Sequence, residues 1–243
     1  MHTLILSDVH ANLTALDAVL EDAGPIDRVW CLGDIVGYGP DPNECIERIR
    51  SLPGLVCVKG NHDAAVLGEI PYKAFNHEAQ ASLIWLESVI VPEHRDWLDG
   101  LEKQQTCDQV TLVHGSPRNP VWEYILDQGS AMENMDCFDT QICLVGHTHL
   151  PSLFNMTGGN PKSTRHCALT QNAPVKLNQK CILNPGSVGQ PRDNDPRPSY
   201  LLYDDELDQW CLKRVDYEIR QVQDRILAAG LPKRHAFRLA EGW

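Results

Sequence analysis

Five short apolar segments in this chain each run directly into a carboxylate, carboxamide or imidazole side chain. The segments, each with the polar residues that follow it, are 4–6 with Asp8 and His10, 29–32 with Asp34, 55–59 with Asn61, 110–113 with His114, and 142–145 with His147 and His149. Short continuous apolar runs that end at turn residues are typical of strands buried on both faces of a sheet. Because ligands bind beyond the carboxyl ends of the strands in open α/β sheets, we expect these five ends to converge on one site.

The first third of the chain alternates between these apolar segments and helical patterns. Leu13, Leu16 and Val19 share one helical face, and Asn12 can cap that helix. A second helical pattern covers residues 43–51. The resulting βαβαβ order predicts parallel strands joined by right-handed crossovers.

The rest of the chain becomes helical and then strand-rich. Residues 76–101 have helical periodicity with a break at Pro92, which we interpret as a helical layer or small cap at about 72–102. Further apolar strands and a closing helix are predicted at 181–183, 200–203, 210–212 and 218–229, joined by turn-rich connections such as 155–162 and 191–198. We therefore predict a single domain, residues 1–243, of the α/β (α+β) class, with two mixed β-sheets packed face to face between helices.

Composition narrows the class of protein. No apolar run approaches the roughly 20 residues that cross a bilayer, and the N-terminus lacks a basic region before its first apolar segment, so we expect a cytoplasmic protein. The nine cysteines are odd in number and form no CxxC pair, which argues for reduced thiols over a zinc ribbon or redox site. A net charge of −12 disfavours binding to long nucleic acids.

The spacing of the polar residues supports a shared centre. Asp8 and His10 are two positions apart, as are His147 and His149. Residues i and i+2 of an extended backbone point the same way, so each pair can present both side chains to one centre. Each dipeptide alone is a weak signal, but their joint occurrence at strand ends favours a metal site.

The donor set indicates which metals such a site would take. Two Asp, one Asn and four His offer oxygen and nitrogen donors without thiolate, which suits Mn, Fe, Co, Ni or Zn. Seven ligands are too many for one ordinary site but suit two divalent ions if one carboxylate bridges them.

The order DxH, GD, GNH[DE], H and GHxH resembles the calcineurin-like metallophosphoesterase superfamily. The stretches at 7–12, 33–40, 60–63 and 184–189 are similar to its bacterial and archaeal branch of small phosphodiesterases and diadenosine tetraphosphatase-like proteins. The resemblance covers residues 1 to about 215. It implies the four-layer fold of that superfamily and a hydrolase acting on phosphoric ester bonds.

The resemblance also implies a role for each residue. Asp8, His10 and His149 would hold the first metal, Asn61, His114 and His147 the second, with Asp34 bridging the two. His62 would face the leaving group as a catalytic acid, and Asp63 would orient its imidazole. A hydroxide bridging the metals would attack a phosphomonoester or phosphodiester in line, with nucleotide-type substrates among the candidates.

Other polar residues near these motifs have two interpretations each. Arg192 is either a phosphate clamp or an exposed loop arginine. Asn12 either binds near the site or only caps its helix, and Ser187 either reaches the site or only shapes its turn. Tyr38 either lines a pocket or packs.

Two other functions are compatible with the same fold. A protein-interaction scaffold would be expected to lack His62 or several ligands, and none is missing. A nuclease fits poorly with the acidic balance and the absence of a basic stripe. We therefore expect a small phosphate-ester substrate and neither a membrane nor a long nucleic acid as partner.

Overall fold

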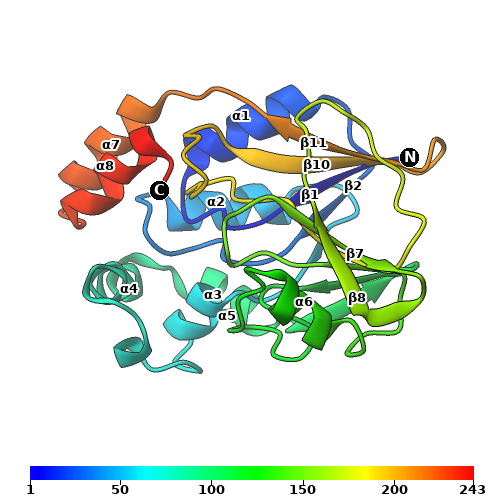
Figure 1. Ribbon diagram of the computed structural model, residues 1–243. Coiled ribbons are helices and arrows are strands. Elements are labelled where there is room, and N and C mark those ends of the chain that lie inside the picture. Colours follow the sequence, from blue (N-terminus) through cyan, green and yellow to red (C-terminus); the bar gives the residue numbers. More distant parts are fainter.

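Two mixed β-sheets pack face to face, with helices on their outer sides, in the computed structural model, which describes residues 1–243 (Figure 1). The first sheet has the strand order β11-β10-β1-β2-β3 and the second the order β4-β5-β6-β9-β7-β8. The strands are β1 (His2–Leu6), β2 (Arg28–Cys31), β3 (Val56–Cys57), β4 (Gln104–Cys107), β5 (Val110–Val113), β6 (Ile142–Leu144), β7 (Ser152–Thr157), β8 (Asn160–Cys167), β9 (Cys181–Asn184), β10 (Ser199–Asp204) and β11 (Gln209–Arg214). The predicted fold class is confirmed.

Parallel pairing brings the carboxyl ends of the central strands together. In the first sheet β1 pairs in parallel with β2, and β2 with β3. In the second sheet β5, β6 and β9 are parallel neighbours. The remaining strands of both sheets pair antiparallel. The five strands β1, β2, β3, β5 and β6 therefore deliver the residues that follow them to one edge of the two-sheet core.

Alternate residues of the apolar strands fill two different cores. Leu4 and Leu6 of β1 pack against helices on the outer face of the first sheet, whereas Ile5 packs between the two sheets. In β2, Trp30 likewise lies between the sheets. Because successive side chains of a strand point to opposite faces, a continuous apolar run serves both cores and fixes the register of the strand.

The helices lie on the outer sides of the two sheets and beside their carboxyl ends. They are α1 (Leu13–Ala23), α2 (Pro42–Arg50), α3 (Asn61–Val66), the 3₁₀ turn η1 (Tyr72–Ala74), α4 (His77–Val89), α5 (Pro92–Asp99), α6 (Gln128–Asn134), α7 (Ile219–Ala228) and α8 (Lys233–Glu241). Figure 1 shows α6 against the second sheet, and α7 and α8 side by side near α1. The predicted cap of α1 is confirmed, since the Asn12 side chain accepts a hydrogen bond from the Ala15 N–H at 3.1 Å.

The segment at 72–102 forms part of a helical layer. Leu83 and Leu86 of α4 and Leu98 of α5 are buried in the core on the outer side of the first sheet. This burial anchors the two helices by about 1.5–3 kcal/mol per side chain. Only the residues just before α4 reach the cleft described below.

Several elements differ from the prediction. Residues 155–162 were predicted as a turn-rich connection, but β7 and β8 form a hairpin through them, with a tight turn at Gly158 and Gly159. Strand β8 is mostly exposed and polar, so it carries no apolar alternation from which it could be recognised. The short helices α3 and α6 were also missed, because they carry too few apolar residues to show a helical period. Helix α8 was missed as well, although Ala236 and Leu239 lie on its buried face.

Two compositional expectations can be compared with the structure. No helix combines the length and the apolar character needed to cross a membrane. All nine cysteines are free, and five of them are buried in the manner of small apolar side chains.

Candidate metal centre

The polar residues at the five strand ends converge, as predicted. The seven candidate ligands are each at most 4% exposed and come from the segments after β1, β2, β3, β5 and β6: Asp8, His10, Asp34, Asn61, His114, His147 and His149. Their donor atoms form two main groups that could each hold a metal ion. Burial of so many polar side chains is unfavourable unless each finds a partner.

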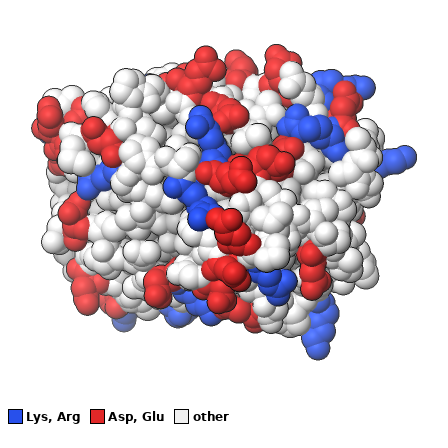
Figure 2. Space-filling model, turned by 180° about the vertical axis from the view of Figure 1, so that it is seen from behind, with Lys and Arg blue, Asp and Glu red and all other residues white.

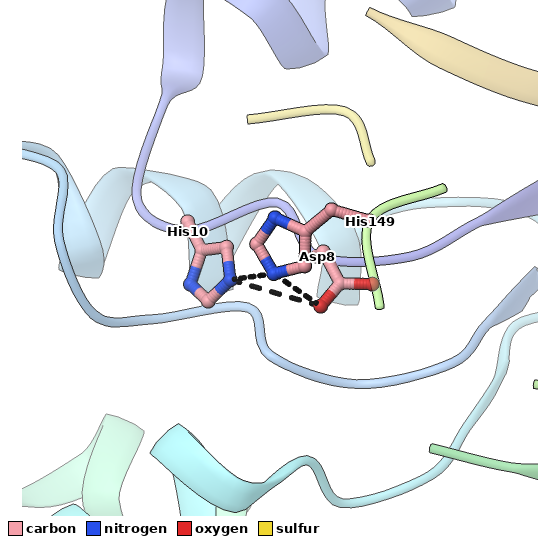
Figure 3. A group of neighbouring side chains, drawn as sticks. All are labelled: Asp8, His10 and His149. Atoms are coloured by element: carbon pink, nitrogen blue, oxygen red, sulfur yellow. Dashed lines mark hydrogen bonds and ion pairs between the residues drawn. The ribbon is translucent and has the colours of Figure 1, made fainter. Parts of the chain in front are cut away.

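The first group consists of Asp8, His10 and His149 (Figure 3). The Asp8 Oδ1 atom lies 3.1 Å from the His149 Nε2 atom and 3.7 Å from the His10 Nε2 atom. The two Nε2 atoms lie 3.1 Å apart. Two imidazole nitrogens and one carboxylate oxygen thus face a common point.

The second group is centred on His114. Its Nε2 atom lies 3.3 Å from Asp34 Oδ2, 3.2 Å from His147 Nδ1 and 3.0 Å from Asn61 Oδ1. Asp34 Oδ2 is also 3.7 Å from the Nε2 atom of His10, which belongs to the first group. Asp34 therefore lies between the two groups, in the position of a shared ligand.

All four histidines are anchored in the same way. The outward nitrogen of each ring lies at a backbone carbonyl oxygen: His10 Nδ1 at Val36 (3.1 Å), His114 Nδ1 at Leu32 (2.8 Å), His149 Nδ1 at Gln190 (2.5 Å) and His147 Nε2 at Trp122 (3.2 Å). A carbonyl can only accept, so the outward nitrogen carries the proton and the inward nitrogen of a neutral ring presents its lone pair. This is the arrangement that orients histidines bound to metals.

The inward-facing atoms of the first group lack suitable partners of their own. Asp8 Oδ1 is buried and accepts no hydrogen bond. The inward nitrogens of His10 and His149 face each other, although neutral rings anchored in this way would both present lone pairs there. A cation between these atoms would satisfy all of them, so the donor set fits a divalent ion with oxygen and nitrogen ligands.

The ionisation states of Asp34, His147 and His149 agree with this fit. Burial alone would raise the pKa of Asp34, but the imidazoles of His114 and His62 outweigh it and hold that pKa well below its usual range. Burial lowers the pKa of His147 to about 3 and, together with Arg192, that of His149 to about 4. At neutral pH Asp34 is thus a carboxylate, and both histidines keep free lone pairs. The Asp34 and Asp8 carboxylates outweigh burial and raise the pKa of His114 to about 9, so a metal ion would have to displace its proton.

The backbone of the centre is strained. Asp8, His10, Asp34, His147 and His149 all have φ between 48° and 64°, in the left-handed region that residues other than glycine rarely occupy. Such strain is concentrated at functional sites and costs about 1–3 kcal/mol per residue. The expectation of extended backbone at both i, i+2 pairs is therefore wrong. Asp8 and His10 still share a group, but His147 and His149 belong to different groups.

His62 lies beside the two groups, and Asp63 does not orient it. The His62 ring is buried, with its centroid 5.0 Å from that of His10, and its Nδ1 atom has no hydrogen-bond partner. The Asp63 carboxylate instead accepts four backbone N–H groups, those of Asp34, Ile35, Val36 and Gly60. The predicted orienting role of Asp63 is wrong, because these bonds direct its carboxylate toward the loop that carries Asp34.

Gly37 sets the room available to His62. A Cβ atom at Gly37 would lie 2.4 Å from the His62 Nδ1 atom, and the φ of this glycine is 92°. No other residue type fits this conformation and this close approach. The His62 Nδ1 atom, which has no hydrogen-bond partner, therefore packs against the backbone of the loop that carries Gly37.

A cleft of about 200 Å³ opens onto the centre. Arg192 lines it together with Tyr38, whose ring lies 5.9 Å from the guanidinium carbon of Arg192. Arg192 donates to Gln190 Oε1 at 2.9 Å, forms no ion pair, and has a buried Nε atom without a partner. Its charge is therefore free to meet an anion in the cleft.

Asn12 and Ser187 do not line this cleft. The Asn12 side chain caps α1 and donates to the Gly189 carbonyl at 3.1 Å. The Ser187 hydroxyl donates to the Asp8 carbonyl and accepts from the Gln190 N–H, both at 2.8 Å. Both residues shape the loops around the centre, so the structure favours the second of the two interpretations for each: a helix cap for Asn12 and a turn-shaping residue for Ser187.

Three other residues of the cleft could not be recognised from the sequence. Phe75 precedes α4, and Trp122 and Tyr124 lie in the loop between β5 and α6. Each stands outside any recognisable motif, and only the folded chain brings them to the centre.

The sequence of the chain is similar to those of proteins from one superfamily. Residues 1–207 match the calcineurin-like phosphoesterase superfamily domain. An uncharacterized protein of Methanocaldococcus jannaschii is 36% identical over 239 residues, which cover 94% of this chain and 93% of that protein. A symmetrical bis(5'-nucleosyl)-tetraphosphatase of Psychromonas ingrahamii is 30% identical over 169 residues, which cover 67% of this chain but only 59% of that enzyme.

Solved structures give the same result. A metallophosphoesterase from Sphaerobacter thermophilus is 42% identical, with a TM-score of 0.89 over 100% of this chain and 99% of that one. A hypothetical protein from Pyrococcus horikoshii, 22% identical, has the same fold, with a TM-score of 0.80 over 100% of this chain and 98% of that one. These matches extend over the segments that carry the converging residues, and the chain belongs to the calcineurin-like phosphoesterase superfamily, as a hydrolase acting on phosphoester bonds.

Proposed function

We propose that the chain is a dinuclear metallophosphoesterase acting as one domain over residues 1–243, on a small phosphomonoester or phosphodiester. Asp8, His10 and His149 would hold one divalent ion, Asn61, His114 and His147 the other, and Asp34 both. The observation that carries the proposal is the common anchoring of the four imidazoles, which aims four inward nitrogens at two points beside Asp34. Two ions bound there would supply a nucleophile by acidifying water and would neutralise phosphoryl charge.

His62 is the proposed general acid. Burial lowers the pKa of its imidazole, while the Asp34 carboxylate opposes that shift. The negative charge of a bound phosphoester would favour the protonated ring further. Held against Gly37, the ring can then pass its proton to the departing oxygen, a contribution of about 10²–10⁴-fold.

The metal identity is proposed from the donor chemistry, and the substrate class from a relative. Oxygen and nitrogen donors without thiolate favour Mn, Fe, Co, Ni or Zn. The tetraphosphatase relative is named for a bis(5'-nucleosyl) tetraphosphate, which makes nucleotides candidates here. On the face drawn in Figure 2, Lys and Arg are scattered among Asp and Glu without a continuous basic stripe, which favours a small substrate over a long nucleic acid.

Replacing Arg192 with Ala should raise KM about tenfold or more and leave kcat nearly unchanged. Its guanidinium has no acidic partner, and a hydrogen bond to a charged group contributes about 1.5–3 kcal/mol. Steady-state kinetics on a phosphodiester would measure this. Arg197→Ala is the control on the same loop, because Arg197 is paired with Asp195 at 2.7 Å. An equal change of KM in both variants would contradict a phosphate contact.

A substrate panel tests the function as a whole. We expect the Mn²⁺-loaded protein to hydrolyse at least one of bis-p-nitrophenyl phosphate, p-nitrophenyl phosphate, a cyclic nucleotide and a dinucleoside tetraphosphate. Chelation should abolish this activity and added Mn²⁺ should restore it. No hydrolysis of any of these esters by protein that carries two metals would contradict the proposal and favour a scaffold.

A further inference from the structure

Part of the cleft lining is built from aromatic side chains. Phe75, Trp122 and Tyr124 line the cleft together with Arg192 and several of the candidate ligands. The Phe75 and Trp122 rings meet edge to face, with centroids 5.2 Å apart at 87°. The two residues beside Phe75 in the chain, Ala74 and Asn76, also line the cleft and carry no charge. We refer to Phe75, Trp122 and Tyr124 as the aromatic wall.

Packing accounts for only one residue of the aromatic wall, Phe75, which is partly buried against the core on the outer side of the first sheet. Trp122 and Tyr124 belong to none of the hydrophobic cores, and the Tyr124 side chain is 45% exposed. A large apolar surface left open beside a polar centre is typical of a ligand site.

Support of the metal centre accounts for only part of the aromatic wall. Tyr124 stacks on His147 with centroids 3.8 Å apart at 11°, which covers one face of its ring. Trp122 holds His147 through its backbone carbonyl, a contact that does not depend on its side chain. The Trp122 indole and the second face of Tyr124 are therefore available to another group.

Phe75 links the aromatic wall to the reacting end of the cleft. Its ring lies 5.0 Å from the His62 ring, edge to face. The organic group of a phosphoester bound beside His62 would thus lie within reach of the aromatic wall.

The volume of the cleft limits the size of the ligand that it can enclose. The cleft holds about 200 Å³, less than the roughly 300–1,000 Å³ of sites that enclose a drug-sized ligand. It suits a phosphate and one planar ring, with any further part of the substrate outside.

We propose that the aromatic wall is a specificity subsite that stacks a planar aromatic ring of the substrate, with Trp122 as its principal residue. Aromatic side chains stack on any flat π-system, and a nucleobase and a simple aryl group share that chemistry. The inference rests on the proposed function only in placing the phosphate beside His62 and Arg192.

Binding of matched ligands tests the subsite without catalysis. The first pair is the non-hydrolysable phosphonate analogues of AMP and of ribose 5-phosphate, which differ only in the base. The second pair is phenylphosphonate and methylphosphonate. Calorimetry on the Mn²⁺-loaded protein should give a Kd about tenfold lower for the aromatic member of a pair, since stacking of one base contributes on this order. Tighter binding of the aromatic member of the first pair would identify a nucleotide as the substrate class. A preference confined to the second pair would identify an aryl ester.

Substitutions of Trp122 test whether the aromatic wall causes the preference for the ligand that carries a ring. Trp122→Leu keeps apolar bulk but removes the ring, so the ratio of the two Kd values should approach one while the ligand without a ring binds as before. Trp122→Phe should keep most of the ratio. Phe237→Leu is the control, because Phe237 is an exposed aromatic residue on α8. No preference in either pair, or equal weakening of both ligands by Trp122→Leu, would overturn the subsite. Hydrolysis on the substrate panel without ring preference would refute the subsite alone, whereas ring preference without hydrolysis would refute only the proposed function.

Discussion

Replacing Asp34 with Asn should lower phosphoesterase activity by more than about 10³-fold, because metal ions contribute several kcal/mol of transition-state stabilisation and each 1.36 kcal/mol is a factor of ten. Asp34 Oδ2 lies 3.3 Å from His114 and 3.7 Å from His10, so its charge serves both groups of ligands. Asn keeps the shape of the side chain but removes that charge. Both metals should therefore bind more weakly, as measured by metal analysis after dialysis.

The control for this variant is Asp136→Asn. Asp136 is exposed and takes part in no ion pair, so its replacement removes the same charge from the protein surface. It should retain full activity and both metals. If Asp34→Asn lost only one metal, Asp34 would belong to one site, and the shared position proposed here would be wrong.

Replacing His62 with Ala should reduce turnover of a poor leaving group by about 10²–10⁴-fold and spare the metal content. The imidazole lines the cleft and neither ring nitrogen forms a hydrogen bond within the protein; the Nδ1 atom packs against Gly37, which leaves the Nε2 atom available to a substrate oxygen. A p-nitrophenolate leaving group needs little protonation, and its release should be affected much less. The measurement is kcat on an alkyl phosphoester and on a p-nitrophenyl phosphoester, with metal analysis of the same samples.

His94→Ala is the matched control for a buried histidine. His94 lies on α5 with 4% exposure, and its Nδ1 atom contacts Asn43 Oδ1 at 3.0 Å, away from the centre. The His94→Ala variant should have the same ratio of kcat on the alkyl phosphoester to kcat on the p-nitrophenyl phosphoester as the unmodified protein. Loss of both metals from His62→Ala would show that His62 acts as a ligand, a role compatible with its proximity to His10 and Asp34.

The strand ends show what the sequence can predict. Runs such as 4–6 and 29–32 are apolar at every position, which identifies strands buried on both faces. Parallel pairing then follows from the intervening helices, and the convergence of the residues after each strand follows from parallel pairing. The candidate ligands were predictable because this chain of inference depends only on local pattern and topology.

The conformation of the ligand loops was not predictable in the same way. Asp8, His10 and His149 adopt left-handed backbone, which their own residue types do not favour. Tertiary contacts impose it, for example the His10 N–H bond to the Asp34 carbonyl at 2.9 Å. Such contacts join segments far apart in sequence, so no local pattern reveals them.

The residues that line the substrate side of the cleft could not be predicted from the sequence either. Trp122, Tyr124 and Phe75 come from loops without a regular period, and aromatic residues in such loops usually pack. Asn12 and Ser187 illustrate the reverse case, because they stand inside recognisable motifs yet serve the loops. Proximity to a motif in sequence therefore does not predict contact with substrate.

Anomalous diffraction from crystals of the Mn²⁺-loaded protein would test the central claim most directly. We expect two peaks on either side of the Asp34 carboxylate, about 3.5–4 Å apart as in other two-metal sites. One should contact Asp8, His10 and His149, and the other Asn61, His114 and His147. A single peak at full Mn²⁺ saturation, or two peaks that do not share Asp34, would contradict the account.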